Sequence, residues 1–408
     1  MSELIVNGGR PLSGAISVSG SKNAALPIIF ATVVTGGVSL IENLPDIGDV
    51  RIALEIIEGL GARISRDGAV TIIDTEHLEY TRPSLADVSR IRASTYLIGA
   101  CLSRFGVCDE MAFGGCNFSS RPIDLHISAA EALGARLENG RFYAKSLVGG
   151  AIDFPIPSVG ATVNALLMGV AAKGDTVIRG FACEPHIESL LEFLLSAGAD
   201  ITRSDSEIII RGRDLHGGRI RIPGDMIEAG TYLALGALSR RGVSVSGVDA
   251  RELSAVLEVL FALGSEISSD HGNITVRQGE KMRYAELVAS PYPGFPTDLQ
   301  PVFSVPMHVA GGKMTDTVWT SRFGYLDALS RFGLIYRKEN TSAHIHPSQL
   351  RCSTVRAPDL RGGMACVMAA LLADGKSVIE SFETVERGYE SLAMKLCALG
   401  ADVRAIKK

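Results

Sequence analysis

Residues 191–211 contain the pattern that decides the fold. The stretch begins with Leu191-Glu-Phe-Leu-Leu-Ser-Ala197, turns at Gly198-Ala199 and ends with Glu207-Ile-Ile-Ile-Arg211. Its first part has the apolar spacing of a helix, and its last part is typical of a β-strand. The glycine between them fits a helix that ends in the left-handed conformation, which glycine adopts at little cost.

The same helix–glycine–strand pattern occurs six times along the chain. Its turns lie at Gly61-Ala62, Gly134-Ala135, Gly198-Ala199, Gly264-Ser265, Gly333-Leu334 and Gly400-Ala401. A second series of half-units interleaves with the first and turns at Gly37, Gly106, Gly174, Gly242, Gly312 and Gly375. Copies of one supersecondary unit bury their apolar faces on their neighbours. Because 408 residues exceed the usual size of one core, we expect an α/β protein of two domains with three units each.

The composition narrows the class of protein. The net charge of −5 leaves no basic surplus of the kind that nucleic-acid-binding proteins carry. Seven cysteines without a Cys-x-x-Cys pair indicate a reducing compartment rather than a disulfide framework or a zinc site. We see neither a secretory signal nor an apolar run of the roughly 18 residues that span a bilayer. We therefore expect a cytoplasmic protein without metal, nucleic-acid partner or membrane insertion.

Small and polar residues mark the expected start of the first helix in each unit. These starts are Ser21-Lys22-Asn23-Ala24, Ile91-Arg92-Ala93-Ser94, Ser158-Val159-Gly160-Ala161-Thr162, Glu228-Ala229-Gly230-Thr231, Thr297-Asp298-Leu299 and Asp359-Leu360-Arg361-Gly362. A helix start carries a partial positive charge and free N–H groups, and it favours anions. Lys22, Arg92 and Arg361 add full positive charges at three of these positions. This recurrence favours anion binding over three solvated helix caps.

Two loops carry further candidates. Residues 114–126 place Cys116 near Arg121, and a cation beside an open loop favours a thiolate or a thiol that exchanges its proton. The other cysteines, among them Cys101, Cys366 and Cys397, are expected to be small core residues. The proline-rich stretch 291–298 leads Asp298 to a helix start, where the residue type alone favours a helix cap.

Two arginines nearer the C-terminus each have two possible interpretations. Arg322 follows a short predicted strand, and Arg387 stands beside a glycine turn. Each is either an anion ligand or a surface salt-bridge partner.

Five motifs in order resemble the UDP-N-acetylglucosamine 1-carboxyvinyltransferase family, which is related to enolpyruvylshikimate-phosphate synthase. They are Ser21–Pro27, the loop from Cys116 to His126, Ser158–Thr162, Pro293–Asp298 and Arg387–Glu390. The resemblance implies an inside-out α/β barrel made of two similar domains, each with three βαβαββ-type units. The implied domains are residues 21–226 and residues 1–20 plus 227–408, with the active site in the cleft between them.

The resemblance also implies a reaction. The enolpyruvyl group of phosphoenolpyruvate passes to the 3′-hydroxyl of UDP-N-acetylglucosamine, and phosphate is released; this is the first committed step of peptidoglycan synthesis. The family implies no cofactor, no metal and no obligate protein partner.

The residue roles follow from the same resemblance. Cys116 would be the acid and the covalent partner of phosphoenolpyruvate, and Asp298 the base at the sugar hydroxyl. Catalysis would also involve Lys22 and Arg387, which with Arg121 would hold the phosphate, while Arg322 and Arg361 would hold the carboxylate. Asn23 would lie beside both substrates. The sugar nucleotide would contact Arg92, Arg121, Pro122, Ile123, Asp124, Leu125, Ser158, Val159, Gly160, Asp298 and Val318.

Some positions depart from the family pattern. They are Asn117–Ser120, Met226 and Trp319–Ser321. These departures leave open an enolpyruvyltransferase acting on another nucleotide, such as UMP. A catalytically silent paralogue that binds a UDP-sugar is the third possibility, and the retention of Cys116 together with Asp298 argues against it.

Overall fold

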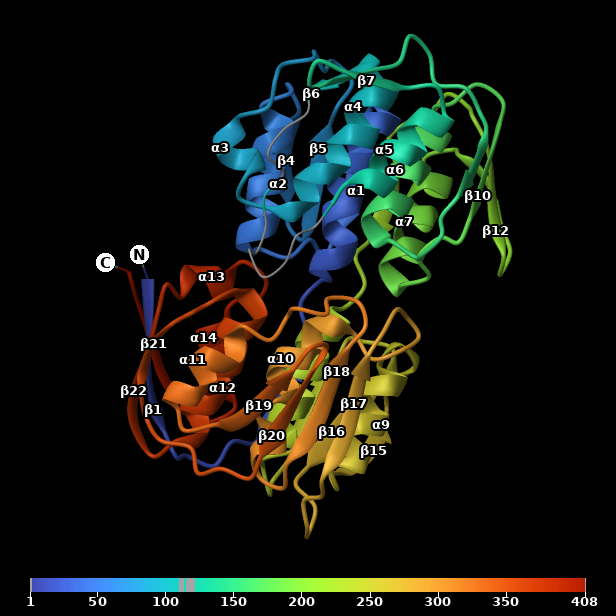
Figure 1. The fold of residues 1–408 in the computed structure, drawn as a ribbon. Coiled ribbons are helices and arrows are strands. Elements are labelled where there is room, and N and C mark those ends of the chain that lie inside the picture. The colour runs from blue at the N-terminus through green and yellow to red at the C-terminus, as the bar shows by residue number, and fades with distance from the viewer. Residues whose placement is uncertain (1, 110–113, 115–121, 408) are drawn as a thin grey trace. The chain divides into compact units, whose positions relative to one another are not determined.

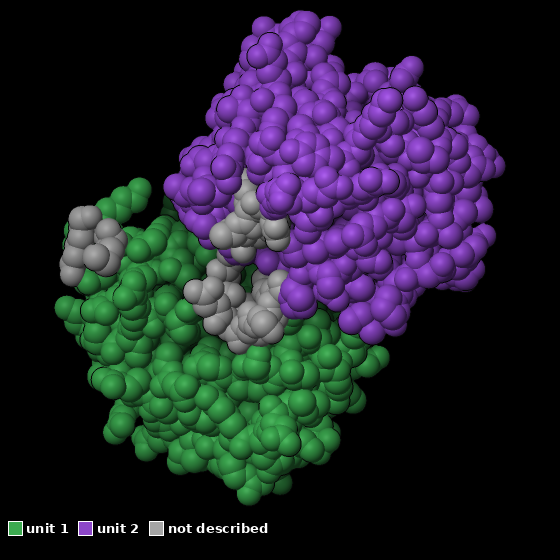
Figure 2. Space-filling view, turned by 45° about the horizontal axis from the view of Figure 1, so that its top comes forward, with its two compact units in different colours: residues 1–19, 117–119, 224–408 green, residues 20–116, 120–223 purple. Residues whose placement is uncertain are grey.

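The computed structural model describes residues 2–109, 114 and 122–407 of the chain. These residues form two compact units. Unit 1 contains residues 2–19 and 224–407, and unit 2 contains residues 20–109, 114 and 122–223. Figure 2 colours unit 1 green and unit 2 purple. We predicted two functional domains with limits near residues 20 and 227, and that division stays a prediction.

Unit 2 alternates helices with short strands (Figure 1). Its helices are α1 (Lys22–Thr35), α2 (Gly48–Glu58), α3 (Leu85–Val88), η1 (Arg92–Tyr96), α4 (Leu97–Phe105), α5 (Asp124–Ala132), α6 (Val159–Gly169) and α7 (Pro185–Ser196). Its strands are β3 (Val38–Glu42), β4 (Arg63–Asp67), β5 (Val70–Asp74), β6 (Val107–Asp109), β7 (Arg136–Glu138), β8 (Arg141–Tyr143), β9 (Ala151–Asp153), β10 (Asp175–Arg179), β11 (Asp200–Arg203), β12 (Glu207–Arg211) and β13 (Arg219–Arg221).

Unit 1 has the same alternation. Its helices are α8 (Met226–Gly236), η2 (Ala250–Leu253), α9 (Ser254–Ala262), η3 (Thr297–Leu299), α10 (Gln300–Phe303), η4 (Pro306–His308), α11 (Tyr325–Arg331), α12 (Leu360–Leu372), α13 (Glu383–Glu386) and α14 (Leu392–Ala398). Its strands are β1 (Ser2–Gly8), β2 (Gly14–Ser17), β14 (Val243–Ser246), β15 (Glu266–Asp270), β16 (Asn273–Arg277), β17 (Ala285–Ala289), β18 (Gly312–Asp316), β19 (Ile335–Glu339), β20 (Ser342–His346), β21 (Thr354–Arg356), β22 (Gly375–Glu380) and β23 (Asp402–Lys407).

The sheets repeat one topology. In the described residues there are five four-stranded sheets and one three-stranded sheet. In the sheet β17-β18-β20-β19, β17 runs parallel to β18, and β18 runs antiparallel to the second strand of the hairpin β19–β20. The sheet β9-β10-β12-β11 of unit 2 has the same order and directions. The repeat in the sequence is therefore a repeat in structure.

Three sheets contain strands from distant parts of the chain. β1 lies between β22 and β23 and pairs antiparallel with both. β2 pairs in parallel with β14, and β13 pairs in parallel with β3. The first strands of the chain therefore complete sheets of unit 1, although the next 200 or so residues belong to unit 2.

The core of each unit is built around helices that are apolar on nearly every side. Helix α1 is buried except at Lys22, Asn23 and Val34, which are half-buried, and α12 is buried from Leu360 to Leu371. A helix that is hydrophobic all round belongs in the interior. Figure 1 shows α10, α11 and α12 between the sheet of β1, β21 and β22 and the sheet of β17, β18 and β20. Each unit has its own hydrophobic core.

The predicted helix–strand turns are confirmed with one correction. The main-series glycines all have positive φ: Gly61, Gly134, Gly198, Gly264, Gly333 and Gly400. In the second series the prediction at Gly312 is wrong, because the turn residue is Gly311 with φ 84°. Gly312 already begins β18, where a Cβ atom would lie 2.7 Å from Met307 Sδ.

Three local predictions are also corrected. Helix α8 begins at Met226 rather than near Glu228, because the Asp225 carboxylate accepts the N–H groups that follow it. Asp298 does not cap a helix; it lies inside η3. Cys397 and Cys352 are exposed and therefore not core residues, whereas Cys101 and Cys366 are buried.

In the described part of the chain, no helix is long and apolar enough to cross a membrane.

Candidate active site

Asp298 lies between two buried arginines of unit 1. Arg322 Nη1 donates to Asp298 Oδ1 over 2.8 Å, and Arg361 Nε and Nη2 donate to Oδ2 over 3.1 and 3.0 Å. The side chains of Arg322 and Arg361 are only 5% and 2% exposed, whereas that of Asp298 is 27% exposed. One open carboxylate therefore faces two guanidinium groups that the protein interior fixes in place.

Helix α12 and the aromatic ring of Tyr389 hold Arg361. Asp359 caps the helix by accepting the N–H groups of Arg361 and Gly362, both at 2.9 Å. The guanidinium carbon of Arg361 lies 5.3 Å from the centre of the Tyr389 ring, which favours a cation. Tyr389 is in turn fixed by a 3.0 Å hydrogen bond between its hydroxyl and that of Thr231.

Asp316 connects the Arg322 loop to the segment that carries Asp298. At the end of β18, its Oδ1 accepts the N–H groups of Val318 and Trp319 over 2.9 and 2.7 Å. Its Oδ2 accepts the hydroxyl of Thr297 over 2.6 Å. Asp316 is fully buried and was not predicted. Its position at a strand end, six residues before an arginine, is a weak signal in the sequence.

Both arginines remain charged in this environment. Burial opposes the charge of Arg361, but Asp298, Tyr389 and Asp225 together outweigh the burial, and the pKa of Arg361 is raised. The pKa of Arg322 is likewise raised, because Asp298 and Asp359 outweigh its burial. Arg361 Nη1 is buried and makes no hydrogen bond within the described residues. The pair is therefore suited to hold a small carboxylate in bidentate fashion.

In unit 2, Lys22 and Asn23 occupy the first turn of α1. Ser21 caps this helix by accepting the N–H of Ala24. Lys22 Nζ lies 3.3 Å from Asp49 Oδ2 of α2, and the two side chains are 14% and 6% exposed. Asn23 is half-buried. The predicted lysine is therefore held by an internal carboxylate at a helix start.

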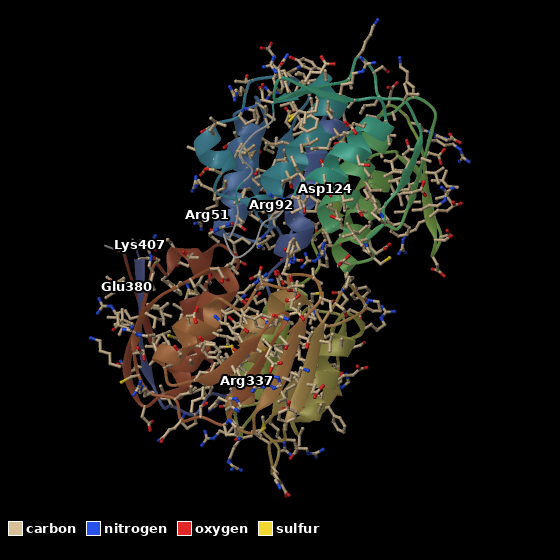
Figure 3. The ribbon with its side chains drawn as sticks, viewed as in Figure 1. Arg51, Arg92, Asp124, Arg337, Glu380 and Lys407 are labelled. Carbon is tan, nitrogen blue, oxygen red and sulfur yellow. The ribbon has the colours of Figure 1, made fainter. Side chains whose placement is uncertain are left out.

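A second group of predicted residues in unit 2 surrounds the starts of η1, α5 and α6. Arg92 Nη2 donates to the carbonyl of Pro122 over 3.5 Å. Figure 3 labels Arg92 and Asp124, and Asp124 begins α5. Ser158 caps α6 by accepting the N–H of Ala161.

The exposure of this second group suits ligand binding. Pro122 and Asp124 are exposed, and the remaining residues, Ile123, Leu125, Ser158, Val159 and Gly160, are half-buried.

The predicted site residues thus fall into sets. Asp298, Arg322 and Arg361 come together in unit 1, where Val318 is half-buried and bonded to Asp316. Arg387 follows α13 and is half-buried. Cys116 and Arg121 lie outside the described residues. A joint site that includes both units stays a prediction.

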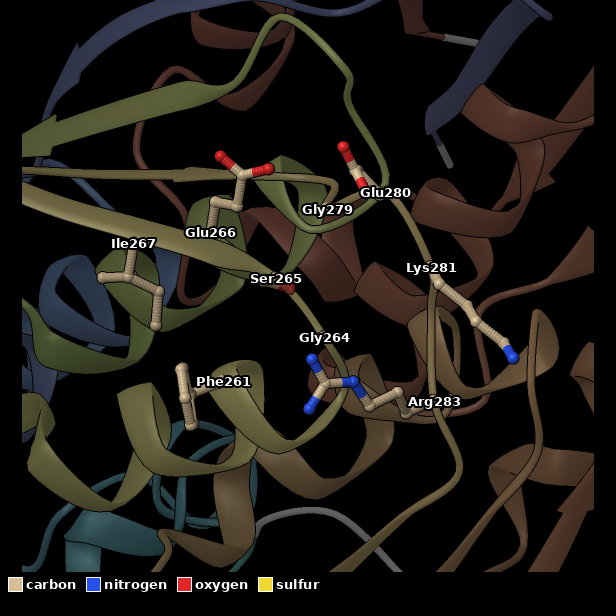
Figure 4. A pocket seen from close by; sticks show the side chains of 9 residues that line it. All are labelled: Phe261, Gly264, Ser265, Glu266, Ile267, Gly279, Glu280, Lys281 and Arg283. Carbon is tan, nitrogen blue, oxygen red and sulfur yellow. The ribbon is translucent and has the colours of Figure 1, made fainter.

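A pocket of about 600 Å³ in unit 1 is lined by residues outside these sets (Figure 4). It is lined by Phe261, Gly264–Ile267, Gly279–Lys281 and Arg283. No predicted site residue lines it, and its acidic and basic side chains are mixed. We therefore do not regard it as the active site.

Comparison with known sequences identifies similar proteins along the whole chain. The family described as EPSP synthase (3-phosphoshikimate 1-carboxyvinyltransferase) matches residues 6–396. A UDP-N-acetylglucosamine 1-carboxyvinyltransferase of Halothermothrix orenii is 39% identical, with 100% of both chains covered. A protein of Listeria monocytogenes named UDP-N-acetylglucosamine 1-carboxyvinyltransferase 2 is 40% identical over 98% of this chain and 97% of its own.

Solved structures agree in fold. The enolpyruvyl transferase NikO from Streptomyces tendae has a TM-score of 0.90 and 25% identity, covering 100% of this chain and 99% of its own. EPSP synthase from Acinetobacter baumannii has a TM-score of 0.75 at 18% identity, with both chains fully covered. The latter similarity establishes the mixed α/β fold alone.

Proposed function

The chain belongs to the family of EPSP synthase (3-phosphoshikimate 1-carboxyvinyltransferase), and from this premise we propose that it is an enolpyruvyltransferase. It transfers the enolpyruvyl group of phosphoenolpyruvate to the 3′-hydroxyl of UDP-N-acetylglucosamine and releases phosphate. The observation that carries the proposal is the Asp298 carboxylate between two buried guanidinium groups. The acceptor is the one named for relatives of 39–40% identity over almost the whole chain.

The proposal also concerns the architecture of the protein and its place in metabolism. Each unit is one domain of an inside-out α/β barrel, and the substrates bind between the two domains. The enzyme acts in the cytoplasm, at the first committed step of peptidoglycan synthesis, without cofactor or metal.

The proposed reaction proceeds by addition and elimination. The thiol proton of Cys116 goes to C3 of phosphoenolpyruvate, and C2 becomes electrophilic. The oxygen of the sugar hydroxyl bonds to C2 as its proton goes to Asp298. The thiolate of Cys116 then takes back a proton from C3, the electron pair of that C–H bond forms the double bond, and the bond between C2 and the phosphate oxygen breaks as phosphate leaves. These steps need an acid, a base and fixed cations, which the proposed residues supply.

The arginine pair couples the binding of phosphoenolpyruvate to the basicity of Asp298. Arg322 and Arg361 already hold one carboxylate, that of Asp298. The carboxylate of phosphoenolpyruvate has the same chemistry and competes for the same donors. A carboxylate that loses charge-assisted hydrogen bonds becomes a better proton acceptor. Binding of phosphoenolpyruvate would therefore release Asp298 for its role as base.

The remaining cations take the other anionic groups in this proposal. Lys22, Arg121 and Arg387 bind the phosphate of phosphoenolpyruvate, and Asn23 lies beside both substrates. Arg92, the segment 121–125 and the start of α6 at Ser158–Gly160 bind the uridine diphosphate. Helix starts suit this role because their free N–H groups face the anion.

The direct test is phosphate release from phosphoenolpyruvate with UDP-N-acetylglucosamine, UMP or shikimate-3-phosphate as acceptor. We expect release with UDP-N-acetylglucosamine only, and loss of this activity when fosfomycin alkylates Cys116. The variant Cys116→Asp should keep proton transfer and resist alkylation. Release with UMP only would change the acceptor, as the departures at Met226 and Trp319–Ser321 allow. No release with any acceptor, despite nucleotide binding, would favour the silent paralogue.

A further inference from the structure

Asn164 is a fully buried polar residue inside α6, outside the predicted site. Its Oδ1 accepts the N–H of Gly99 over 2.6 Å. Its Nδ2 has two N–H groups for three neighbouring acceptors: His126 Nδ1 at 2.7 Å is the shortest contact, and the carbonyls of Thr95 and Gly160, at 3.1 and 3.2 Å, share the other N–H. Burying an amide costs free energy unless it is hydrogen-bonded, and this one uses both its oxygen and its nitrogen.

The partners of Asn164 come from all three segments predicted to bind the nucleotide. Thr95 lies in η1, which begins at Arg92. His126 lies in the first turn of α5, which begins at Asp124. Gly160 lies in the first turn of α6, which Ser158 caps. One side chain therefore sets the relative positions of three helix starts within unit 2.

The contact with Asn164 also selects the tautomer of His126. An amide nitrogen can only donate, so Nδ1 of the imidazole must accept, and the proton of the neutral ring is on Nε2. Burial lowers the pKa of His126 to about 4, with Arg92 acting in the same direction and Asp124 opposing it. The ring is therefore neutral at pH 7.

The Nε2–H group lies at the start of α6. A Cβ atom on Gly160 would be 3.0 Å from His126 Nε2 and 2.7 Å from Cε1. His126 is 5% exposed, and within the described residues Nε2 makes no hydrogen bond. A nearly buried donor thus stands beside the N–H groups of a helix start, with Arg92 close enough to affect its charge.

We infer that Asn164 is a positioning residue for nucleotide binding, which aligns three helix starts and holds His126 as an Nε2–H donor toward a phosphate oxygen. The inference rests on the proposed function, because that function makes the ligand a nucleoside diphosphate. It adds a neutral donor, oriented by a neutral amide, to the cationic and backbone donors already proposed.

The variant Asn164→Asp reverses the polarity of the contact with His126 and also removes the donation to the carbonyls of Thr95 and Gly160. Aspartate keeps the acceptor for Gly99 N–H, but it draws the proton of His126 to Nδ1 and leaves a lone pair on Nε2. Calorimetry on the full chain at pH 8.5 should show UDP-N-acetylglucosamine bound about 10- to 100-fold more weakly than by the unaltered protein. The KM for phosphoenolpyruvate should change much less, because within the described residues the hydrogen bonds of Asn164 go to Thr95, Gly99, His126 and Gly160, none of which is a proposed ligand of phosphoenolpyruvate.

The pH dependence of binding separates positioning from general damage. At pH 6 the new carboxylate favours a doubly protonated His126, which again donates through Nε2, against the opposing charge of Arg92 and with the help of Asp124. Binding to Asn164→Asp should therefore recover as the pH falls, while the unaltered protein stays nearly constant. Equal weakening at both pH values, or none at either, would overturn the inference.

Two further measurements test the inference if Asn164→Asp does not fold or does not bind substrate. Nitrogen-15 NMR of the ring should show the Nε2–H tautomer in the unaltered protein, and this readout needs no substrate. If Asn164→Asp does not fold, His126→Leu should weaken nucleotide binding about tenfold, whereas His126→Gln, which can still donate, should weaken it less. Thr176→Val is the matched control, since Thr176 is fully buried in unit 2 and its hydroxyl makes no hydrogen bond within the described residues.

The outcomes distinguish the two proposals. Failure of the unaltered protein to bind UDP-N-acetylglucosamine, UDP or UMP would refute the proposed function and with it the inference. Tight binding of the nucleotide that is unaffected in Asn164→Asp and His126→Leu would refute only the inference.

Discussion

Two helices in each compact unit begin a sequence repeat and have a side-chain cap, and the capping group differs between the units. In unit 1, α8 and α12 are capped by the carboxylates of Asp225 and Asp359. In unit 2, α1 and α6 are capped by the hydroxyls of Ser21 and Ser158. Both kinds of side chain satisfy free N–H groups equally well, but only the carboxylate offsets the partial positive charge of the helix start.

In the proposed function, this difference would separate two ways of binding an anion. In unit 1 the helix starts are neutralised, and the positive charge comes from Arg322 and Arg361. In unit 2 the first turns of α1 and α6 contain no acidic residue, and a neutral His126 lies beside the start of α6. A chain with a net charge of −5 can thus offer anion sites without a basic surface.

The largest effect should come from removing the carboxylate of unit 1. Asp298→Asn keeps the shape of the side chain but cannot take a proton, so kcat should fall on the order of 10²- to 10⁴-fold. The KM for phosphoenolpyruvate should not rise, since the arginines lose a competing carboxylate. Steady-state kinetics check both values, with the exposed Asp327→Asn of the same unit as control. A raised KM with unchanged kcat would assign Asp298 to substrate binding.

The next effect concerns a buried ion pair of unit 1, which is shorter than the Lys22–Asp49 pair of unit 2. Lys395 Nζ lies 2.5 Å from Glu228 Oε1, and the side chains are 16% and 3% exposed. Burial raises the pKa of Glu228, and Lys395 opposes the rise. Lys395→Met removes this opposition, and a buried charge left without its partner costs about 3–5 kcal/mol of unfolding free energy at pH 7.5.

The sign of the pH dependence follows from the direction of the shift. A carboxyl whose pKa is raised on folding contributes stability at low pH that is lost as the pH rises through the raised value. Lys395→Met should therefore be less destabilised at pH 5 than at pH 7.5 in urea unfolding. The double variant with Glu228→Gln should lose this pH dependence. Equal destabilisation at both pH values would contradict the buried-charge explanation.

The smallest effect should come from exchanging the kind of cap in unit 2. Ser158→Asp still caps α6 but places a negative charge where the diphosphate is proposed to bind. We expect nucleotide binding to weaken by about 1–2 kcal/mol, roughly 5- to 30-fold, with an unchanged melting temperature. Ser158→Asn, a neutral cap, is the control and should bind nearly as the unaltered protein does. If both variants bind alike, the charge of the helix start does not contribute.

Local features were predictable from the sequence, and tertiary pairs were not. The glycines that end helices, such as Gly61 and Gly198, require a positive φ that leaves a clear mark in the sequence. The start of α12 was predictable in the same way, from Asp359. Cys397 shows the limit, because apolar neighbours along a helix do not reveal which side faces solvent.

The candidate site was predictable in its residues but not in its supports. Arg322 and Arg361 were singled out, and the structure brings both to Asp298. Asp316 and Asn164 were missed, since their roles depend on partners that lie 19 to 69 residues away in the chain. A side-chain amide in an otherwise apolar stretch of helix, as Asn164 is in α6, was the signal available for it.

The position of β1 has a consequence for how the protein is made. The strand is synthesised first, but its partners β22 and β23 begin at Gly375 and Asp402. At about 5–20 residues per second, the ribosome delivers them tens of seconds later. Unit 2 has all its strands once residue 221 has emerged. During translation, the first strand must therefore wait unpaired while the other half of the protein is free to fold.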